Sequence, residues 1–219
     1  MQIDLRMREE AGAVCDHHLA QVAPPRSKGI HVSELIQSIA INTGKLKTKN
    51  NKLDHGARFN LDKVIDEENF PLPMAIGCSV EDYLSRQYPK MLYHIGEMEL
   101  DDIYMSPDGV TIPDDGSFDF SLGSGIVEEI KTTWKSARKP IEAQWTWLAQ
   151  VKSYCKALPT LCARLHVVYI NGDYDYNRPG PPPQYIIYSL QFTQEELDDN
   201  WQMILNEKAD WERTGRVKL

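Results

Sequence analysis

Long hydrophobic runs are missing from this 219-residue chain. A membrane-spanning helix needs roughly 18 or more consecutive apolar residues, and no stretch approaches that length. The N-terminal segment from Met1 to Glu10 is charged and has no apolar core of a secretory signal. We therefore expect a cytoplasmic protein with no membrane partner.

Paired cysteines are also missing. The chain has four cysteines, and no two of them form a C-x-x-C pair. This spacing argues against a zinc knuckle and gives no support to an iron–sulfur cluster. We expect free thiols at Cys15, Cys78, Cys155 and Cys162.

An excess of positive charge is lacking as well, since the formal net charge is −8. That balance argues against a generic nucleic-acid binder, but the distribution of charge matters more than its sum. Each basic cluster could simply be a solvated loop, although two of them favour a phosphate-backbone partner. The clusters are Lys45, Lys47, Lys49 and Lys52, then Lys131, Lys135, Arg138 and Lys139.

The length suits one domain with a sizeable core. We expect residues 1–30 to form a weakly ordered lead-in and residues 31–219 to form a single domain. Ser33 can cap a helix that runs to about Ile41, and Ser79 can cap a second from Val80 to Gln87. Residues 45–70 are polar and are expected to be a loop.

The remaining patterns alternate between strand and helix. A strand is expected from Met91 to Met105, closed by the turn Pro107-Asp108-Gly109. Further predicted elements are strands at 126–132, 165–170 and 185–192, and helices at 141–158 and after the capping box Thr193-x-x-Glu196. This order predicts an α/β (α+β) fold with a central mixed β-sheet flanked by helices.

Two carboxylates and an amine stand at the ends of predicted strands. Asp108 follows Pro107, and Glu129 precedes Lys131 by two residues, so Glu129 and Lys131 project from the same face of a strand. A hairpin could bring Asp108 beside Glu129, where a hard cation such as Mg²⁺ would remove their repulsion. Either motif alone is weak evidence for a metal site, because Glu-x-Lys is a common surface ion pair and Asp-Gly is a common turn.

The next predicted helix makes the pattern more specific. It carries Gln150-Val-Lys-Ser-Tyr154, a Q-x-x-x-Y motif whose two end residues share a helix face. With Pro107-Asp108 and Glu129-x-Lys131, the chain resembles the PD-(D/E)xK nuclease superfamily, in the branch of RecB-like and Cas4-like nucleases and lambda-type phage exonucleases. Residues 79–158 carry the resemblance, and the Cas4-type cysteine arrangement is missing.

The resemblance implies a restriction-endonuclease-like core in residues 31–219 and hydrolysis of DNA with Mg²⁺, for which Mn²⁺ substitutes. It assigns the metal to Asp108, Glu129 and Ile130. Lys131 would orient or deprotonate the attacking water and stabilise developing charge. Gln150 and Tyr154 would support the site, and Glu81 would add an acid from a preceding helix, although a helix-dipole role also explains Glu81.

Several alternatives remain open. Asp101 and Asp102 are rivals to Asp108 as the metal ligand. The favoured activity is a phage-type exonuclease acting on DNA ends. An endonuclease of the same fold, a catalytically silent nucleic-acid-binding or assembly protein, and an unrelated enzyme with a coincidental Glu-x-Lys are the alternatives. A second copy of the chain and a single-strand annealing protein are the candidate protein partners.

Overall fold

The structure is a computed structural model that describes residues 28–45, 72–87, 91–93, 95–111, 125–173 and 182–215. Most of the predicted lead-in and of the predicted polar loop lies outside these residues. Among them, no helix is both long and apolar enough to cross a bilayer. The helices are α2 (Val32–Asn42), α4 (Leu72–Gln87), α5 (Trp145–Ala157), which follows the 3-10 turn η3 (Ile141–Ala143), and α6 (Gln194–Arg213).

The strands form two sheets. A five-stranded sheet has the order β2-β5-β6-β7-β8, in which β6 and β7 are parallel and the other pairings are antiparallel. A second sheet has the order β1-β4-β3. The strands are β1 (Ile30–His31), β2 (Met91–Tyr93), β3 (Met98–Leu100), β4 (Ile103–Met105), β5 (Gly109–Thr111), β6 (Ile126–Thr133), β7 (Cys162–Tyr169) and β8 (Gln184–Gln191). The predicted mixed α/β architecture is confirmed, whereas the small second sheet was not predicted.

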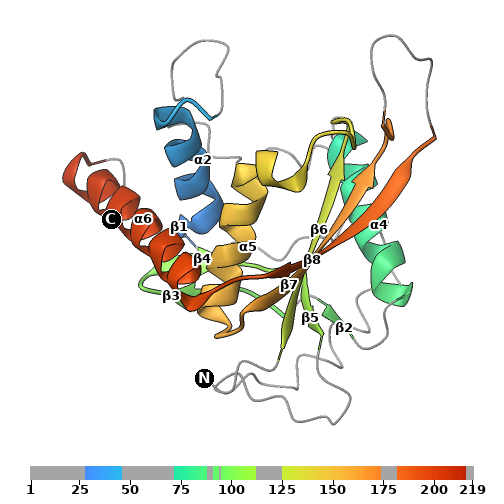
Figure 1. Cartoon of the computed structure of the whole chain (residues 1–219). Helices are drawn as coiled ribbons and strands as arrows, with labels where there is room; N and C mark the ends of the chain where they lie inside the picture. Colours follow the sequence, from blue (N-terminus) through green and yellow to red (C-terminus); the bar gives the residue numbers. More distant parts are fainter. Residues whose placement is uncertain are drawn as a thin grey trace.

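The helices cover the five-stranded sheet from both sides (Figure 1). Helix α5 connects β6 to β7 and packs on one face of these strands, and α2 and α6 pack against α5. Helix α4 packs against β6 from the other face, where Leu84 and Val80 contact Ile130. Strand β6 is therefore the element that both helical layers meet.

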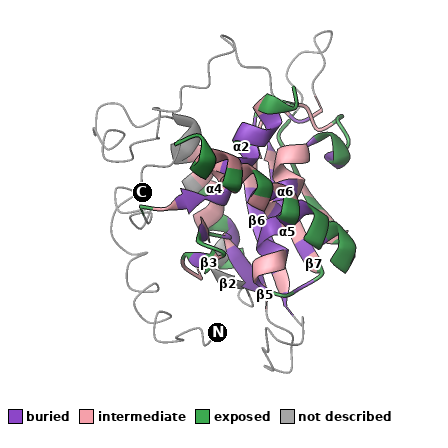
Figure 2. Cartoon of the chain, turned by 90° about the vertical axis from the view of Figure 1, so that its left-hand side faces the viewer, coloured by how far each residue is buried: buried purple, intermediate pink, exposed green. Residues whose placement is uncertain are grey.

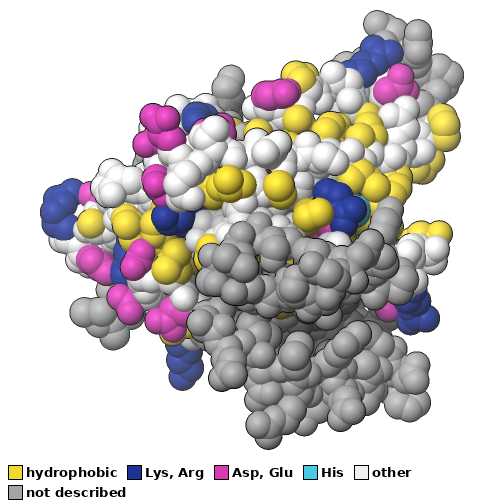
Figure 3. Space-filling model, turned by 60° about the horizontal axis from the view of Figure 1, so that its bottom comes forward, with side chains coloured by type: hydrophobic (Ala, Val, Ile, Leu, Met, Phe, Trp, Pro, Cys, Tyr) yellow, Lys and Arg dark blue, Asp and Glu magenta, His cyan; other side chains and the backbone are white. Residues whose placement is uncertain are grey.

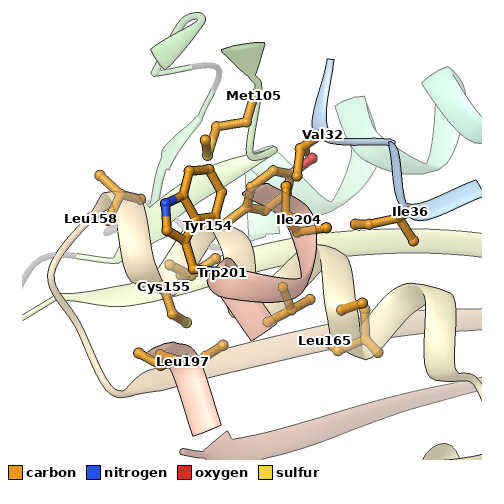
Figure 4. Close-up of a cluster of buried hydrophobic side chains, with 14 of the residues drawn as sticks. Val32, Ile36, Met105, Tyr154, Cys155, Leu158, Leu165, Leu197, Trp201 and Ile204 are labelled. Carbon is orange, nitrogen blue, oxygen red and sulfur yellow. The ribbon is translucent and has the colours of Figure 1, made fainter. Parts of the chain in front are cut away.

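The core lies between α5, α2, α6 and the sheet, as the distribution of buried residues shows (Figure 2). Trp201 and Ile204 of α6 approach Tyr154 and Cys155 of α5 in the close-up of the core (Figure 4). Tyr154 and Cys155 follow buried Val151 by three and four residues, and Leu197, Trp201 and Ile204 are spaced by four and three, so the buried residues line one face of each helix. The helix predicted at 141–158 forms α5 only from Trp145, because Ile141–Ala143 is a 3-10 turn. The helix predicted after the capping box is confirmed as α6, and the capping box at Thr193 and Glu196 is present.

The second predicted helix begins earlier than expected. Helix α4 starts at Leu72, so Ser79 lies inside it and is not its N-cap. Pro73 stands in the first turn, where a missing backbone N–H costs nothing because the first N–H groups have no partner within the helix. The first helix also begins one residue before the predicted cap, since His31 is the N-cap of α2 and Ser33 lies in its first turn.

The single strand predicted from Met91 to Met105 is wrong, because the segment forms β2, β3 and β4. Strands β3 and β4 are an antiparallel pair joined through Asp101 and Asp102, whose φ angles are 52° and 56°. Such left-handed backbone is uncommon for residues other than glycine, although Asp adopts it more readily than most. The turn reverses the chain where the sequence pattern suggested extension.

Candidate active site

The site lies where β6 extends past the end of β5. Strand β5 pairs with Ile126 to Glu128 of β6, so among the described strands none pairs with that edge of β6 at Glu129 to Lys131. Asp108 immediately precedes β5 and occupies this place. Its Oδ2 accepts a hydrogen bond of 2.6 Å from the backbone N–H of Ile130. The hairpin expected from the sequence therefore brings Asp108 beside the strand that carries Glu129.

Glu129 and Lys131 form a partly buried ion pair next to Asp108. The Glu129 side chain is only 2% exposed, and Lys131 Nζ donates a hydrogen bond to its Oε1. The other carboxylate oxygen, Oε2, is buried and has no hydrogen-bond partner. A buried acceptor without a partner costs free energy, so this oxygen is suited to an additional ligand.

Helix α5 holds Lys131 from the other side. Gln150 Oε1 accepts a hydrogen bond of 3.0 Å from Lys131 Nζ, and Gln150 Nε2 donates one of 2.5 Å to the hydroxyl of Tyr154. Tyr154 is buried in the core, 3% exposed, so its hydroxyl is a fixed acceptor. The structure thus joins the Q-x-x-x-Y motif to the Glu-x-Lys motif through one chain of hydrogen bonds.

Burial and mutual charge perturb the titration of these groups. The pKa of Asp108 is raised well above its ordinary value by burial first and by the Glu129 carboxylate second. Burial lowers the pKa of Lys131, but the charges of Glu129 and Asp108 outweigh it and raise that pKa. Lys131 therefore keeps its proton in the metal-free protein, and Asp108 is costly to ionise there.

Glu81 of α4 contributes to the same electrostatic cluster. Its charge raises the pKa of Asp108 and also that of Lys131. Glu81 is half-buried and stands on the helix that packs against β6. The acid that the resemblance placed on the preceding helix is thus close enough to influence the site, even though that helix starts seven residues before Ser79.

The donor set fits a divalent cation. Among the described residues, no group of three or more Asp, Glu, His or Cys side chains is arranged to enclose an ion as it stands. However, Glu129 Oε2 has no hydrogen-bond partner, and the Glu129 carboxylate makes the ionised form of Asp108 unfavourable. A hard cation between the two carboxylates would give Oε2 a partner and would remove the repulsion. The Ile130 side chain packs against Leu84, so Ile130 could contribute only backbone atoms.

The rival acids lie in a different environment. Asp101 Oδ2 accepts a hydrogen bond of 2.8 Å from Trp201 Nε1, and Asp102 pairs with Lys208 at 3.2 Å. Both contacts attach the β3–β4 turn to α6. The Asp102 side chain is 87% exposed, in contrast to the buried surroundings of Glu129. Both residues are held by α6, whereas Asp108 is bonded to the residue between Glu129 and Lys131. This favours Asp108 as the metal ligand.

A pocket of about 240 Å³ opens next to Lys131 and Gln150. Its other walls come from the start of α2 and the start of α5. They are formed by Ser33, Ile36, Gln37, Thr146 and Trp147. The contribution of α2 was not predicted, because the pattern that marks Ser33 as a candidate cap gives no sign that the start of α2 lies beside the start of α5. Trp147 is half-buried and lines the pocket.

The two predicted basic clusters are only partly described. Lys45 lies 3.9 Å from the centre of the Trp145 ring. Lys135 donates a hydrogen bond of 2.8 Å to Gln144 and lies 4.8 Å from the centre of the Trp147 ring. Both lysines thus approach the start of α5. On the face shown in Figure 3, acidic and basic side chains are interspersed among the described residues.

The two described thiols take no part in the site. Cys155 is buried in the core, and burial raises its pKa to about 12. Cys162 is partly buried at the start of β7, and both thiols are free. Free thiols were also predicted at Cys15 and Cys78, but these two side chains lie outside the described part of the structure.

No protein-family model matches the chain, and no curated protein matches it. The solved structures that resemble it include an alkaline exonuclease from Laribacter hongkongensis (TM-score 0.49, 13% identity, covering 85% of this chain and 89% of that chain). Another is a phage-related exonuclease from Haemophilus somnus 129PT (TM-score 0.42, 13% identity, 87% and 94%). A third is a protein named SSO0001 (TM-score 0.46, 9% identity, 91% and 83%).

The Laribacter exonuclease has also been solved in complex with dAMP (TM-score 0.45, 12% identity). The similar structures therefore include exonucleases, the class of nuclease that the sequence motifs suggested. At TM-scores below 0.5, the activity of this chain has to be judged from its own residues.

Proposed function

We propose that this chain is a Mg²⁺-dependent DNA nuclease that acts as an exonuclease at DNA ends. The observation that carries the proposal is the convergence of Asp108, Glu129 and Lys131 at one edge of β6. Two neighbouring carboxylates, one with a buried oxygen lacking a hydrogen-bond partner, are a donor set suited to a hard divalent cation. The ammonium group beside them is suited to a phosphate.

Asp108 and Glu129 would hold the cation, together with the backbone of Ile130. When bound, Mg²⁺ supplies an acidified water and neutralises charge on the scissile phosphate. Mn²⁺ shares the preference for oxygen ligands and is expected to substitute. Glu81 faces the same cluster from α4 and would accept a hydrogen bond from a water at the site.

Lys131 would orient the attacking water and stabilise the negative charge that develops on the phosphate oxygens. Its ammonium group is held by Glu129 and by Gln150, so little reorganisation is needed when that charge forms. Gln150 is held in turn by Tyr154. In this account the helix motif places the catalytic amine, which donates hydrogen bonds to Glu129 and Gln150.

The pocket beside Lys131 supports action at a DNA end. At about 240 Å³ it is smaller than the roughly 300–1,000 Å³ of sites for drug-sized ligands, so it suits part of one nucleotide and not a duplex. Trp147 offers an aromatic wall, and Gln37 and Ser33 offer polar groups. A terminal nucleotide seated there would bring its phosphodiester towards Lys131 and Glu129.

The direct test compares linear and covalently closed circular DNA, each with Mg²⁺ and with chelator. An end-dependent exonuclease degrades the linear DNA, spares the circle and stops when the metal is chelated. Nicked or linearised circles would instead indicate an endonuclease of the same fold. Binding of DNA without cleavage under Mg²⁺ or Mn²⁺ would overturn the proposal in favour of a catalytically silent binding protein.

A further inference from the structure

A second polar cluster lies on the opposite face of the catalytic strand. Glu128 precedes Glu129 on β6, so its side chain points to the face that carries α4. The Glu128 side chain is 0% exposed, and it forms hydrogen bonds with Arg164 and His166 of β7 and with Thr111 of β5. The guanidinium of Arg164 forms an ion pair with this carboxylate. The buried carboxylate is therefore ionised.

The cluster joins four neighbouring strands. An ionised carboxylate only accepts, so His166 Nε2, 2.7 Å from Glu128, carries a hydrogen. In the neutral imidazole, Nδ1 then accepts a hydrogen bond of 2.5 Å from the hydroxyl of Tyr185 on β8. Side chains from β5, β6, β7 and β8 thus meet at one point, one residue away from the proposed ligand Glu129.

Strand β5 is the shortest of the strands that this cluster joins. It has three residues, whereas β6, β7 and β8 have eight each. Asp108 directly precedes it, and Thr111 ends it. The Thr111 hydroxyl donates a hydrogen bond of 2.5 Å to Glu128 and accepts one of 2.9 Å from Arg164. One end of β5 is thus attached to β6 through Thr111, and the other through Asp108 and the Ile130 N–H.

We propose that Thr111 and Glu128 are positioning residues that set the separation of Asp108 and Glu129 from the opposite face of β6. The inference rests on the proposed metal site only for its effect on cation binding. Glu128 keeps Arg164 and His166 as partners without Thr111, so the buried charge stays compensated when Thr111 is changed. Thr111 is therefore the point where the attachment of β5 can be loosened without exposing an unpaired carboxylate.

The test compares Thr111→Val with Thr111→Ser. Valine keeps the shape of threonine but cannot form either hydrogen bond, whereas serine keeps the hydroxyl. Ser38→Ala is the matched control, because it removes a buried hydroxyl that bonds to Glu207 at 2.5 Å in the α2–α6 contact, away from β5. The readouts are the affinity for Mn²⁺ alone, by calorimetry, and the hydrogen-exchange rate of the Ile130 amide.

We expect Thr111→Val to weaken Mn²⁺ binding about tenfold, in the range seen when the supports of metal ligands are removed. The Ile130 amide should exchange faster in this variant, because its acceptor Asp108 is held less firmly. Thr111→Ser and Ser38→Ala should match the wild type in both measurements. An unchanged Ile130 exchange rate in Thr111→Val would overturn the positioning role.

The two readouts separate this inference from the proposed function. If wild-type protein binds no Mn²⁺ and cleaves no DNA, the proposed function fails. The exchange rate of the Ile130 amide still decides whether Thr111 holds Asp108 in place. Wild-type Mn²⁺ affinity in Thr111→Val, together with faster exchange, would contradict the claim that the attachment of β5 governs the metal site.

Discussion

Asp108 is joined to Ile130 by a hydrogen bond from the Ile130 backbone N–H to the Asp108 carboxylate, with 2.6 Å between the two atoms. The bond fixes an acid from one end of β5 against the residue between Glu129 and Lys131. Groups that are 21 residues or more apart in sequence therefore meet at an edge of β6 that no described strand covers. The predictions below follow from this contact.

Asp108→Asn is expected to abolish Mg²⁺-dependent cleavage, because the amide loses the charge that holds a cation. Asp102→Asn is the matched control, since Asp102 lies on the β3–β4 turn and pairs with Lys208. It should cleave linear DNA at the wild-type rate in a gel assay. If Asp102→Asn is inactive and Asp108→Asn is active, the assignment of the ligand is wrong.

Lys131→Ala is expected to lower the cleavage rate by about two to three orders of magnitude, the range seen when one donor to a developing negative charge is removed. DNA binding should change little, because Lys131 is a single, partly buried charge among the groups that face the phosphate. Single-turnover cleavage and fluorescence anisotropy measure the two effects separately. Wild-type turnover by this variant would remove Lys131 from the mechanism.

Gln150→Leu should slow cleavage by about tenfold to a hundredfold, because Lys131 then loses the acceptor that holds it. Tyr154→Phe should have a smaller effect in the same direction, since it removes the partner of Gln150 but leaves Gln150 itself. Cleavage rates of both variants test this order. A larger loss in Tyr154→Phe than in Gln150→Leu would show that the tyrosine acts by another route.

Metal-free stability should depend on pH through Asp108. Burial and the charge of Glu129 raise the pKa of Asp108 in the folded protein above its ordinary value of 3.8. The stability that Asp108 contributes is fully present below pH 3.8, and it is lost as the pH rises through the pKa of Asp108 in the folded protein. In chelator at pH 8, Asp108→Asn should therefore have a higher Tm than wild type, by about 2–4 °C for each kcal/mol.

The difference in Tm should shrink as the pH falls towards 4, because the wild-type carboxyl is then protonated. Addition of Mg²⁺ at pH 8 should stabilise the wild type and not the variant. Thermal unfolding followed by circular dichroism at several pH values measures both trends. A lower Tm for Asp108→Asn in chelator at pH 8 would show that the ionised carboxylate is not strained in the folded protein.

Elements with strong local signals could be predicted from the sequence. The capping box at Thr193 and Glu196 marks the start of α6, and the structure contains both of its hydrogen bonds. Strand β6 was also predicted nearly to its ends, because its apolar residues and its Glu-x-Lys alternate with the period of a strand. The chemistry of the site followed from this alternation, since Glu129 and Lys131 had to share a face.

Other features depend on contacts that no local pattern reveals. The turn at Asp101 and Asp102 contains no glycine, and it is fixed by Trp201 and Lys208 from the distant helix α6. Helix α4 continues through Gly77 and Ser79, residues that favour helix ends, because it packs against β6. The cluster around Glu128 was not predicted either, since its members lie on three other strands.

Diffraction from crystals soaked in Mn²⁺ would locate the cation. We expect an anomalous peak at about 2.0–2.2 Å from both Glu129 Oε2 and an Asp108 carboxylate oxygen, with Lys131 Nζ close by. The peak should disappear in Asp108→Asn crystals. A peak at any other place, or none at these two carboxylates in the wild type, would contradict a metal-dependent nuclease site on β6.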